Sequence, residues 1–232
     1  MLLAILLLNA CGSIPSLQKV ESKIPCLGAI GNEKSTLFKK EFQKVGEPNV
    51  NQPIAVSVKS IAFTKKTYNQ YLNYTGQLGK KTKVSYIDSI SPKPRFYKLK
   101  ITDFVGLKSQ LNSDINKALK EYLLNDKNQK VLVEISFVAQ IPEAQKIDES
   151  EHLFVVEDDG LLTLEGHSAY GNSRIKMAAL QVFDFETASF CWKNSVYGKP
   201  EIAAIALDGK PCPGSTEENP EKLNDTRAYL KF

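Results

Sequence analysis

The dipeptide Asp159-Gly160 is the feature of this 232-residue chain that most narrowly limits its fold. Asp-Gly between two alternating strands favours a two-residue type I′ turn, in which both central residues take positive φ. The turn sets the register of the hairpin and places Asp158 opposite Leu161. Counting outward places His152 opposite His167, the two histidines of the chain. The same register gathers four apolar side chains on the face expected to pack on the core: Leu153, Val155, Leu162 and Leu164.

A long amphipathic helix is expected from about 104 to 124. Asp103 stands before it as an N-cap, whose carboxylate accepts from free backbone N–H groups. Apolar residues recur at every third or fourth position and so share one face; they are Phe104, Leu107, Leu111, Ile115, Leu119 and Tyr122. Strands are expected on either side, over Phe96–Ile101 and Val131–Ala139. Strand, helix and strand in this order predict a right-handed crossover that joins two parallel strands.

Other segments complete the expected architecture. Helical spacing predicts a short helix over 35–45, and the turn of a second hairpin is expected at 186–188. Alternating or continuous apolar residues predict further strands over Ile54–Phe63, Val84–Ile90, Ile175–Phe185, Ser189–Tyr197 and Thr226–Phe232. The chain is therefore expected to form an α+β fold, with a mixed but mostly antiparallel sheet, one long helix and two C-terminal hairpins.

The run from Val182 to Thr187, with Trp192 after it, resembles the Asp-x-x-Thr-Gly-x-x-Trp hairpins of many extracytoplasmic β-rich lipoproteins. Asp184 and Thr187 match the pattern, and Ala188 takes the place of its glycine. The resemblance implies a structural hairpin and no activity.

The first ten residues are uncharged and mostly apolar. This run is shorter than the ~20 residues that span a bilayer, and it fits the apolar region of a secretory signal. It ends in Leu8-Asn9-Ala10-Cys11, which resembles the lipobox of a bacterial lipoprotein. The resemblance implies cleavage before Cys11, a diacylglycerol on its sulfur, and anchoring on the extracytoplasmic side of the bacterial cell envelope. We therefore expect a signal peptide over 1–10, the lipidated cysteine and a tether over 11–34, and one domain over 35–232.

Charge is unevenly distributed along the chain. Residues 34–100 contain 14 Lys and Arg against 3 Asp and Glu, a balance of +11, whereas residues 101–232 contain 14 against 21, a balance of −7. A basic part near the anchor would be attracted to anionic headgroups within a Debye length. The plainer interpretation is a solvated face without a partner. The expected partners are the membrane, through the lipid, and an envelope protein or glycan; nucleic acid is disfavoured by location.

Catalytic motifs fail on inspection. The run from Gly166 to Gly171 is similar to a nucleophile elbow, but its second glycine comes one residue late. No histidine follows Ser168, so the chain order of that hydrolase triad is impossible. We therefore expect a non-catalytic binding or assembly module at the membrane surface. The alternative is a metal-dependent enzyme or hydrolase centred on the hairpin of His152 and His167.

Two groups of residues are candidate sites. In the first, two cross-strand imidazoles, His152 and His167, and the carboxylate of Glu165 could hold zinc or copper. The competing interpretation is ordinary surface histidines, with no cofactor.

The second group combines three tyrosines with lysines: Lys65, Lys66, Tyr68, Tyr71 and Tyr74. On a helix the tyrosines share a stripe, which could stack on sugars or bind anionic glycan or lipid headgroups. The competing interpretation is tyrosines that pack onto the core with their hydroxyls in water.

Three cysteines are left when the lipidated Cys11 is set aside. Export places them in an oxidising compartment, where one pair is expected to close. We predict Cys191–Cys212, which would fix the loop-rich C-terminal segment to the sheet. The alternative is Cys26–Cys212, which would leave Cys191 as a buried thiol.

Overall fold

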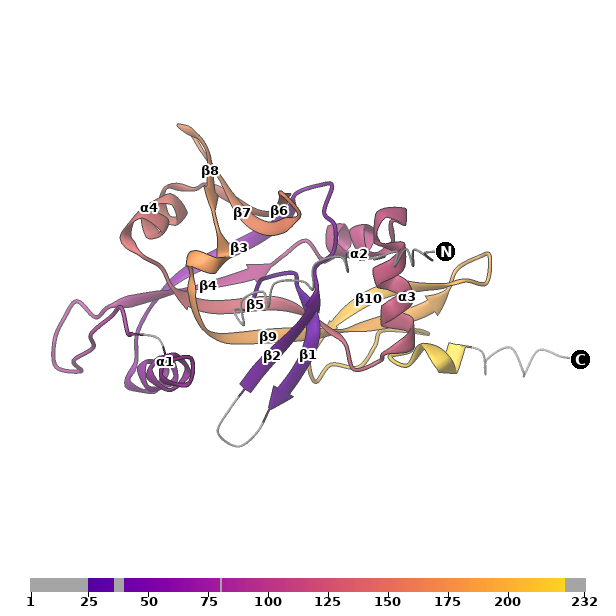
Figure 1. Cartoon of the computed structure of the whole chain (residues 1–232), viewed down its shortest axis with the longest axis horizontal. Coiled ribbons are helices and arrows are strands. Elements are labelled where there is room, and N and C mark those ends of the chain that lie inside the picture. The colour runs from indigo at the N-terminus through magenta and orange to yellow at the C-terminus, as the bar shows by residue number, and fades with distance from the viewer. Residues whose placement is uncertain (1–24, 36–39, 80, 224–232) are drawn as a thin grey trace, which may run out of the picture.

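The computed structural model describes residues 25–35, 40–79 and 81–223, and one ten-stranded sheet runs through it (Figure 1). The strands are β1 Ile30–Ser35, β2 Lys40–Gly46, β3 Ile54–Ala62, β4 Arg95–Ile101, β5 Lys130–Val138, β6 His152–Asp158, β7 Leu161–Ser168, β8 Gly171–Ile175, β9 Gln181–Asn194 and β10 Pro200–Leu207. The helices are α1 Lys65–Gln77, α2 Phe104–Asn112, α3 Lys117–Asn125 and α4 Ile141–Glu149, with short 3₁₀ turns η1 Asp114–Asn116 and η2 Met177–Ala179.

The sheet has the order β10-β9-β5-β4-β3-β6-β7-β8, and β1 and β2 lie off this path, with β1 on β5. β5 lies inside the sheet between β4 and β9. It is buried on both faces, including its polar residues Glu134 and Ser136. Glu134 reaches Lys98 at 2.5 Å and Lys100 at 3.6 Å, so its buried charge is paired. The α+β class and the mostly antiparallel sheet are confirmed.

The segment expected as one long helix is broken between α2 and α3. Ser113 has an extended backbone with φ −67° and ψ 158°. The side chain of Asn112 accepts from the backbone N–H of Ile202 at 3.0 Å and donates to its carbonyl at 2.8 Å, which ties α2 to β10. The hydroxyl of Ser113 also donates to the carbonyl of Gln110, three residues earlier, and local bonds of this kind compete with helical hydrogen bonds. The apolar spacing was interpreted correctly, but the polar run Asn112-Ser113-Asp114 was not recognised as a helix end.

The expected parallel pair is also wrong. β4 and β5 pair antiparallel, with Tyr97 opposite Phe137 and Lys100 opposite Glu134. An antiparallel return needs the chain to come back to the end of the sheet that it left, and two short helices in place of one long helix allow this. Every pairing among the described strands is antiparallel, so the expectation of a mixed sheet was wrong.

The beginning of the domain also differs from expectation. The described part of 35–45 lies in strands β1 and β2 and not in a helix. Gly31 permits this pairing, because a Cβ at that position would clash with the backbone of Gln43. The residues from Pro25 to Ile30 are buried, and the N–H of Gly28 donates to the carbonyl of Leu132 at 2.8 Å. The fold therefore includes residues 25–34, which were expected to belong to the tether.

The second hairpin turns later than expected. β9 runs unbroken through 186–188, where Thr187 is buried and its hydroxyl lies 2.6 Å from a carboxylate oxygen of Glu33 and 2.9 Å from one of Asp208. These contacts hold Thr187 within the sheet. The chain turns between Asn194 and Pro200, with Gly198 at φ 72°. The residues Val84–Ile90 form no strand, and Thr226–Phe232 lie outside the described residues.

Within the described part of the chain, the buried apolar side chains form two clusters. The larger contains the core sides of β4, β5, β7 and β9, and the smaller contains Phe63, Tyr71, Phe96, Val138 and Phe183 under α1. In Figure 1, α1 lies at one end of the molecule, and α2 and α3 lie near β10 at the other. Within the described ranges, no helix has both the length and the apolar character needed to cross a membrane.

Candidate functional site

The hairpin β6–β7 has the expected geometry. Both central residues of its turn take positive φ, 51° at Asp159 and 76° at Gly160. The predicted register is confirmed at each position, so His152 lies opposite His167. The four predicted core residues, Leu153, Val155, Leu162 and Leu164, are all buried.

The histidine pair nevertheless does not form a group of metal ligands. The Nε2 atom of His167 lies 2.8 Å from an oxygen of Glu165, whose other oxygen lies 3.5 Å from the guanidinium of Arg174. The His167 ring packs at 4.9 Å from the ring of Phe154, whereas His152 is exposed. Across residues 25–35, 40–79 and 81–223, no three His, Cys, Asp or Glu side chains are placed to hold a metal ion. The structure therefore lends the zinc hypothesis no support.

The tyrosines of α1 face the protein. Tyr71 is fully buried, and its ring lies 5.7 Å from Phe63 and 5.5 Å from Phe183. Tyr68 and Tyr74 are half-buried and pack against the same small cluster. Lys65 and Lys66, by contrast, are exposed in the first turn of the helix. The structure does not gather these five residues into one stacking surface, and the core interpretation describes the tyrosines better.

The tyrosine hydroxyls hold the loop that follows α1. Tyr71 donates to the side-chain oxygen of Gln181 at 2.7 Å and accepts from the backbone N–H of Lys83 at 2.7 Å. Tyr68 donates to the carbonyl of Val84 at 3.1 Å. Burial raises the pKa of the Tyr71 hydroxyl. It also raises the pKa of Tyr74 to about 12, with a further contribution from nearby carboxylates. The hydroxyls of Tyr71 and Tyr74 therefore stay protonated at neutral pH, and that of Tyr71 helps to fix the loop.

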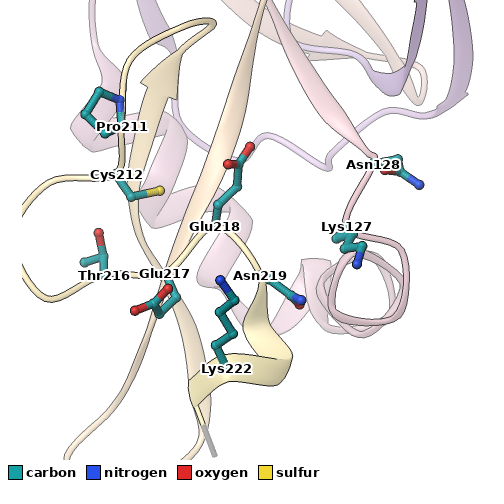
Figure 2. Close-up of a pocket in the computed structure, with 9 residues that line it drawn as sticks. All are labelled: Lys127, Asn128, Pro211, Cys212, Thr216, Glu217, Glu218, Asn219 and Lys222. Atoms are coloured by element: carbon teal, nitrogen blue, oxygen red, sulfur yellow. The ribbon is translucent and has the colours of Figure 1, made fainter. Parts of the chain in front are cut away.

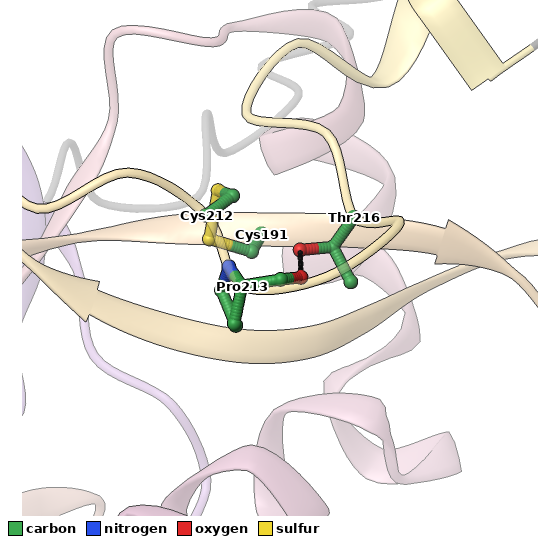
Figure 3. The surroundings of a disulfide bond; sticks show 4 residues. All are labelled: Cys191, Cys212, Pro213 and Thr216. Atoms are coloured by element: carbon green, nitrogen blue, oxygen red, sulfur yellow. Dashed lines mark hydrogen bonds between the residues drawn. A yellow bond between two sulfur atoms is a disulfide. The ribbon is translucent and has the colours of Figure 1, made fainter.

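The predicted disulfide joins Cys191 of β9 to Cys212, with their Cα atoms 5.6 Å apart (Figure 3). The alternative bridge from Cys26 is therefore excluded, and Cys26 is buried elsewhere in the core. The loop after the bridge is further fixed by Thr216, whose hydroxyl donates to the Pro213 carbonyl at 2.6 Å. The backbones of Trp192 and Glu217 exchange hydrogen bonds of 2.7 and 2.9 Å. This stapled loop, residues 208–219, therefore lies firmly against β9.

A cleft of about 650 Å³ opens between the stapled loop and the turn from α3 to β5 (Figure 2). Its lining residues are Lys127, Asn128, Pro211, Cys212, Thr216, Glu217, Glu218, Asn219 and Lys222. This cleft could not be recognised from the sequence, because its two walls lie far apart in the chain. Only the pairing of Cys191 with Cys212 could have indicated that the loop is held against the sheet.

The lining of the cleft carries charged side chains of both signs. Lys127 and Lys222 offer positive charge, and Glu217 and Glu218 offer negative charge. The sulfur of Cys212 is oxidised in the bridge and so is no nucleophile. These groups can bind a polar partner by hydrogen bonds and ion pairs from both sides of the cleft.

Comparison of the chain with protein-family models, curated proteins and solved structures finds no match. The functional interpretation therefore depends on the residues themselves.

Proposed function

We propose that this chain is a lipid-anchored protein of the bacterial cell envelope that binds a polar protein segment without chemical conversion. The proposed anchor is a diacylglycerol on Cys11, supported by the apolar run and the Leu8-Asn9-Ala10-Cys11 motif. That segment lies outside the described residues. The proposed binding site is the cleft beside the stapled loop.

The main support for this proposal is that one wall of the cleft is already ordered before any partner binds. The Cys191–Cys212 bridge and the backbone pair between Trp192 and Glu217 order one wall. Ordering a loop before binding removes an entropic cost that a mobile loop would pay on association. Lysines and glutamates in one cleft suit a peptide segment, which carries both charge signs and backbone hydrogen-bonding groups.

The alternative, an enzyme at the His152 and His167 hairpin, is less well supported. The two carboxylate oxygens of Glu165 contact His167 and Arg174. Arg174 also pairs with Asp158 on the same hairpin. These contacts describe a surface charge network.

The cleft is tested by charge reversal and crosslinking in native membranes. Lys127→Glu and Lys222→Glu should each weaken recovery of a crosslinked partner by about tenfold, the size of one well-placed ion pair. The matched control is Lys66→Glu, the same change on exposed α1 at the other end of the molecule (Figure 1). Equal recovery from all three variants would contradict the assignment of the cleft.

The anchor is tested separately with Cys11→Ser. This variant should leave the membrane fraction or keep an uncleaved signal peptide, because it lacks the acylated sulfur. Wild-type protein that partitions into water with an unmodified Cys11 would contradict the proposed localisation.

A further inference from the structure

The turn between β9 and β10 exposes two adjacent apolar residues. Val196 is 94% exposed and Tyr197 is 87% exposed. Single exposed apolar side chains are common on protein surfaces, but two in sequence at the end of a long hairpin form a protruding apolar tip. We refer to residues 195–199 as the hairpin tip.

The hairpin tip is an ordered turn. The N–H of Ser195 donates to the carbonyl of Lys199 at 2.8 Å, and the N–H of Gly198 donates to the carbonyl of Ser195 at 2.8 Å. The N–H of Lys199 also donates to the Ser195 hydroxyl at 3.2 Å. Gly198 takes φ 72°, which a side-chain-bearing residue rarely adopts. The turn itself therefore holds Val196 and Tyr197 outward.

Positive charge lies just behind the apolar tip. Lys199 belongs to the turn, and Lys193 lies at the end of β9, where it pairs with Glu201 of β10 at 3.2 Å. The side chains of Lys193, Lys199 and Glu201 together carry a net charge of +1. An apolar end, a tyrosine and then lysines is the order of groups that a bilayer surface favours, from acyl chains to anionic headgroups.

We propose that the hairpin tip inserts into the interfacial region of an anionic bilayer, with Val196 and Tyr197 below the headgroups and Lys193 and Lys199 among the phosphates. The inference rests on the lipid anchor proposed above, which would hold the domain at that surface. Amphipathic helices that lie in this region bury their apolar face by ~5–10 Å, a depth that two side chains at the end of a protruding turn can also reach.

This contact would also orient the cleft. Asn194, at the base of the tip, donates from its side-chain amide to the carbonyl of Leu223 at 3.1 Å, next to the cleft residue Lys222. Trp192, two residues earlier, pairs with the cleft residue Glu217. Because these bonds join the hairpin to the cleft wall, the inserted tip would hold the cleft close to the membrane surface.

The test introduces an indole at the tip with Tyr197→Trp in the full anchored protein. The chain contains one tryptophan, Trp192, which is only 2% exposed, so wild-type fluorescence gives the buried reference. The protein is mixed with phosphatidylglycerol vesicles whose acyl chains are brominated, and binding is read by flotation. We expect the added emission to shift to shorter wavelength and to fall at least twofold.

The matched control is Tyr170→Trp. Tyr170 is 97% exposed in the turn from β7 to β8, beside Ala169 and with no lysine in that turn. Its indole should stay water-exposed and unquenched. Val196→Ser with Tyr197→Ser should lower the affinity of unlipidated Cys11→Ser protein for the same vesicles by about tenfold.

The possible outcomes distinguish a failure of this inference from a failure of the proposed lipid anchor. Flotation without quenching at position 197 would overturn the membrane contact of the tip and leave the anchor intact. Quenching by protein whose Cys11 is unmodified would support the tip and contradict the anchor, and neither flotation nor quenching would reject both. If the indole is shielded from water in native envelopes but not in vesicles, the hairpin tip contacts a protein. That result would overturn the proposal that it contacts lipid.

Discussion

Two sets of tyrosines occupy opposite environments in this domain. Tyr71 on α1 is fully buried between Phe63 and Phe183, and its hydroxyl is bonded to Gln181 and Lys83. Two other tyrosines lie in turns between strands and are almost fully exposed. Tyr170, between β7 and β8, is 97% exposed, and Tyr197, between β9 and β10, is 87% exposed.

The difference shows that regular spacing of tyrosines on a helix indicates packing and not a binding surface. Three tyrosines at every third position on a helix share a face, and a shared face on a surface helix is usually the one that packs. The spacing that drew attention to Tyr68, Tyr71 and Tyr74 is therefore evidence of burial. The tyrosines available to a partner lie in turns, where no periodic spacing marks them as binding residues in the sequence.

The largest expected effect comes from removing the buried ring. Tyr71→Ala should lower the free energy of unfolding by ~3–5 kcal/mol, because the ring would leave a cavity beside Phe63 and Phe183. Urea denaturation with Tyr197→Ala as the exposed control measures the contrast. A loss below ~1 kcal/mol at position 71 would show that α1 packs loosely.

Removing only the hydroxyl should have a smaller effect. Tyr71→Phe should cost ~1–2 kcal/mol, because the Lys83 N–H and the Gln181 side-chain oxygen each lose a partner. Amide hydrogen exchange at Lys83 should accelerate more than the global loss of stability explains. Unchanged exchange would mean that the loop is held by other contacts.

High pH should weaken the same cluster. Burial raises the pKa of Tyr74 from 10.0 to about 12, so the folded state holds this proton more tightly than the unfolded state. Its contribution to stability is complete below pH 10 and is lost as the pH rises toward 12. Tyr74→Phe should flatten the fall in the free energy of unfolding over that interval, whereas Tyr170→Phe should keep the wild-type slope. Equal slopes in all three proteins would contradict the burial of Tyr74.

The smallest effect is expected in the turns. Tyr170→Ala and Tyr197→Ala should each change the free energy of unfolding by less than ~0.5 kcal/mol, because both side chains lie in water. Thermal and urea unfolding measure this. A larger loss at Tyr197 would show that the ring supports the turn, and its exposure would then be no argument for a partner.

Local chemistry made part of the fold predictable. Asp159-Gly160 determined the register of β6 and β7 at every position, because few dipeptides take positive φ at two successive residues. The second hairpin was placed wrongly at 186–188, which contains no such dipeptide, whereas the observed turn contains Gly198. The chemistry of the turn residues thus located the reversals better than apolar alternation did.

The remaining errors concern contacts between distant segments. The break at Ser113 depends on Asn112 bonding to Ile202, and the strand at Thr187 depends on its contact with Glu33. The cleft likewise is lined by residues far apart in the chain, such as Lys127 and Lys222. Local propensity cannot show such bonds, because they exist only once the sheet has formed. The disulfide was the one distant contact with a sequence signal, since few cysteines compete for it.

Under the proposed anchor, the buried segment that begins at Pro25 would limit how far the domain can lie from a membrane. Pro25 to Ile30 are all buried, and Gly28 is bonded to Leu132 of β5, so this segment cannot lengthen the tether without unfolding the centre of the sheet. From Cys11 to Pro25 the chain spans roughly 14 peptide units, ~50 Å at full extension. If Cys11 is lipidated as proposed, this length is the greatest distance at which Pro25 can lie from the lipid, and tension on the lipid would act on the buried segment that leads into β1.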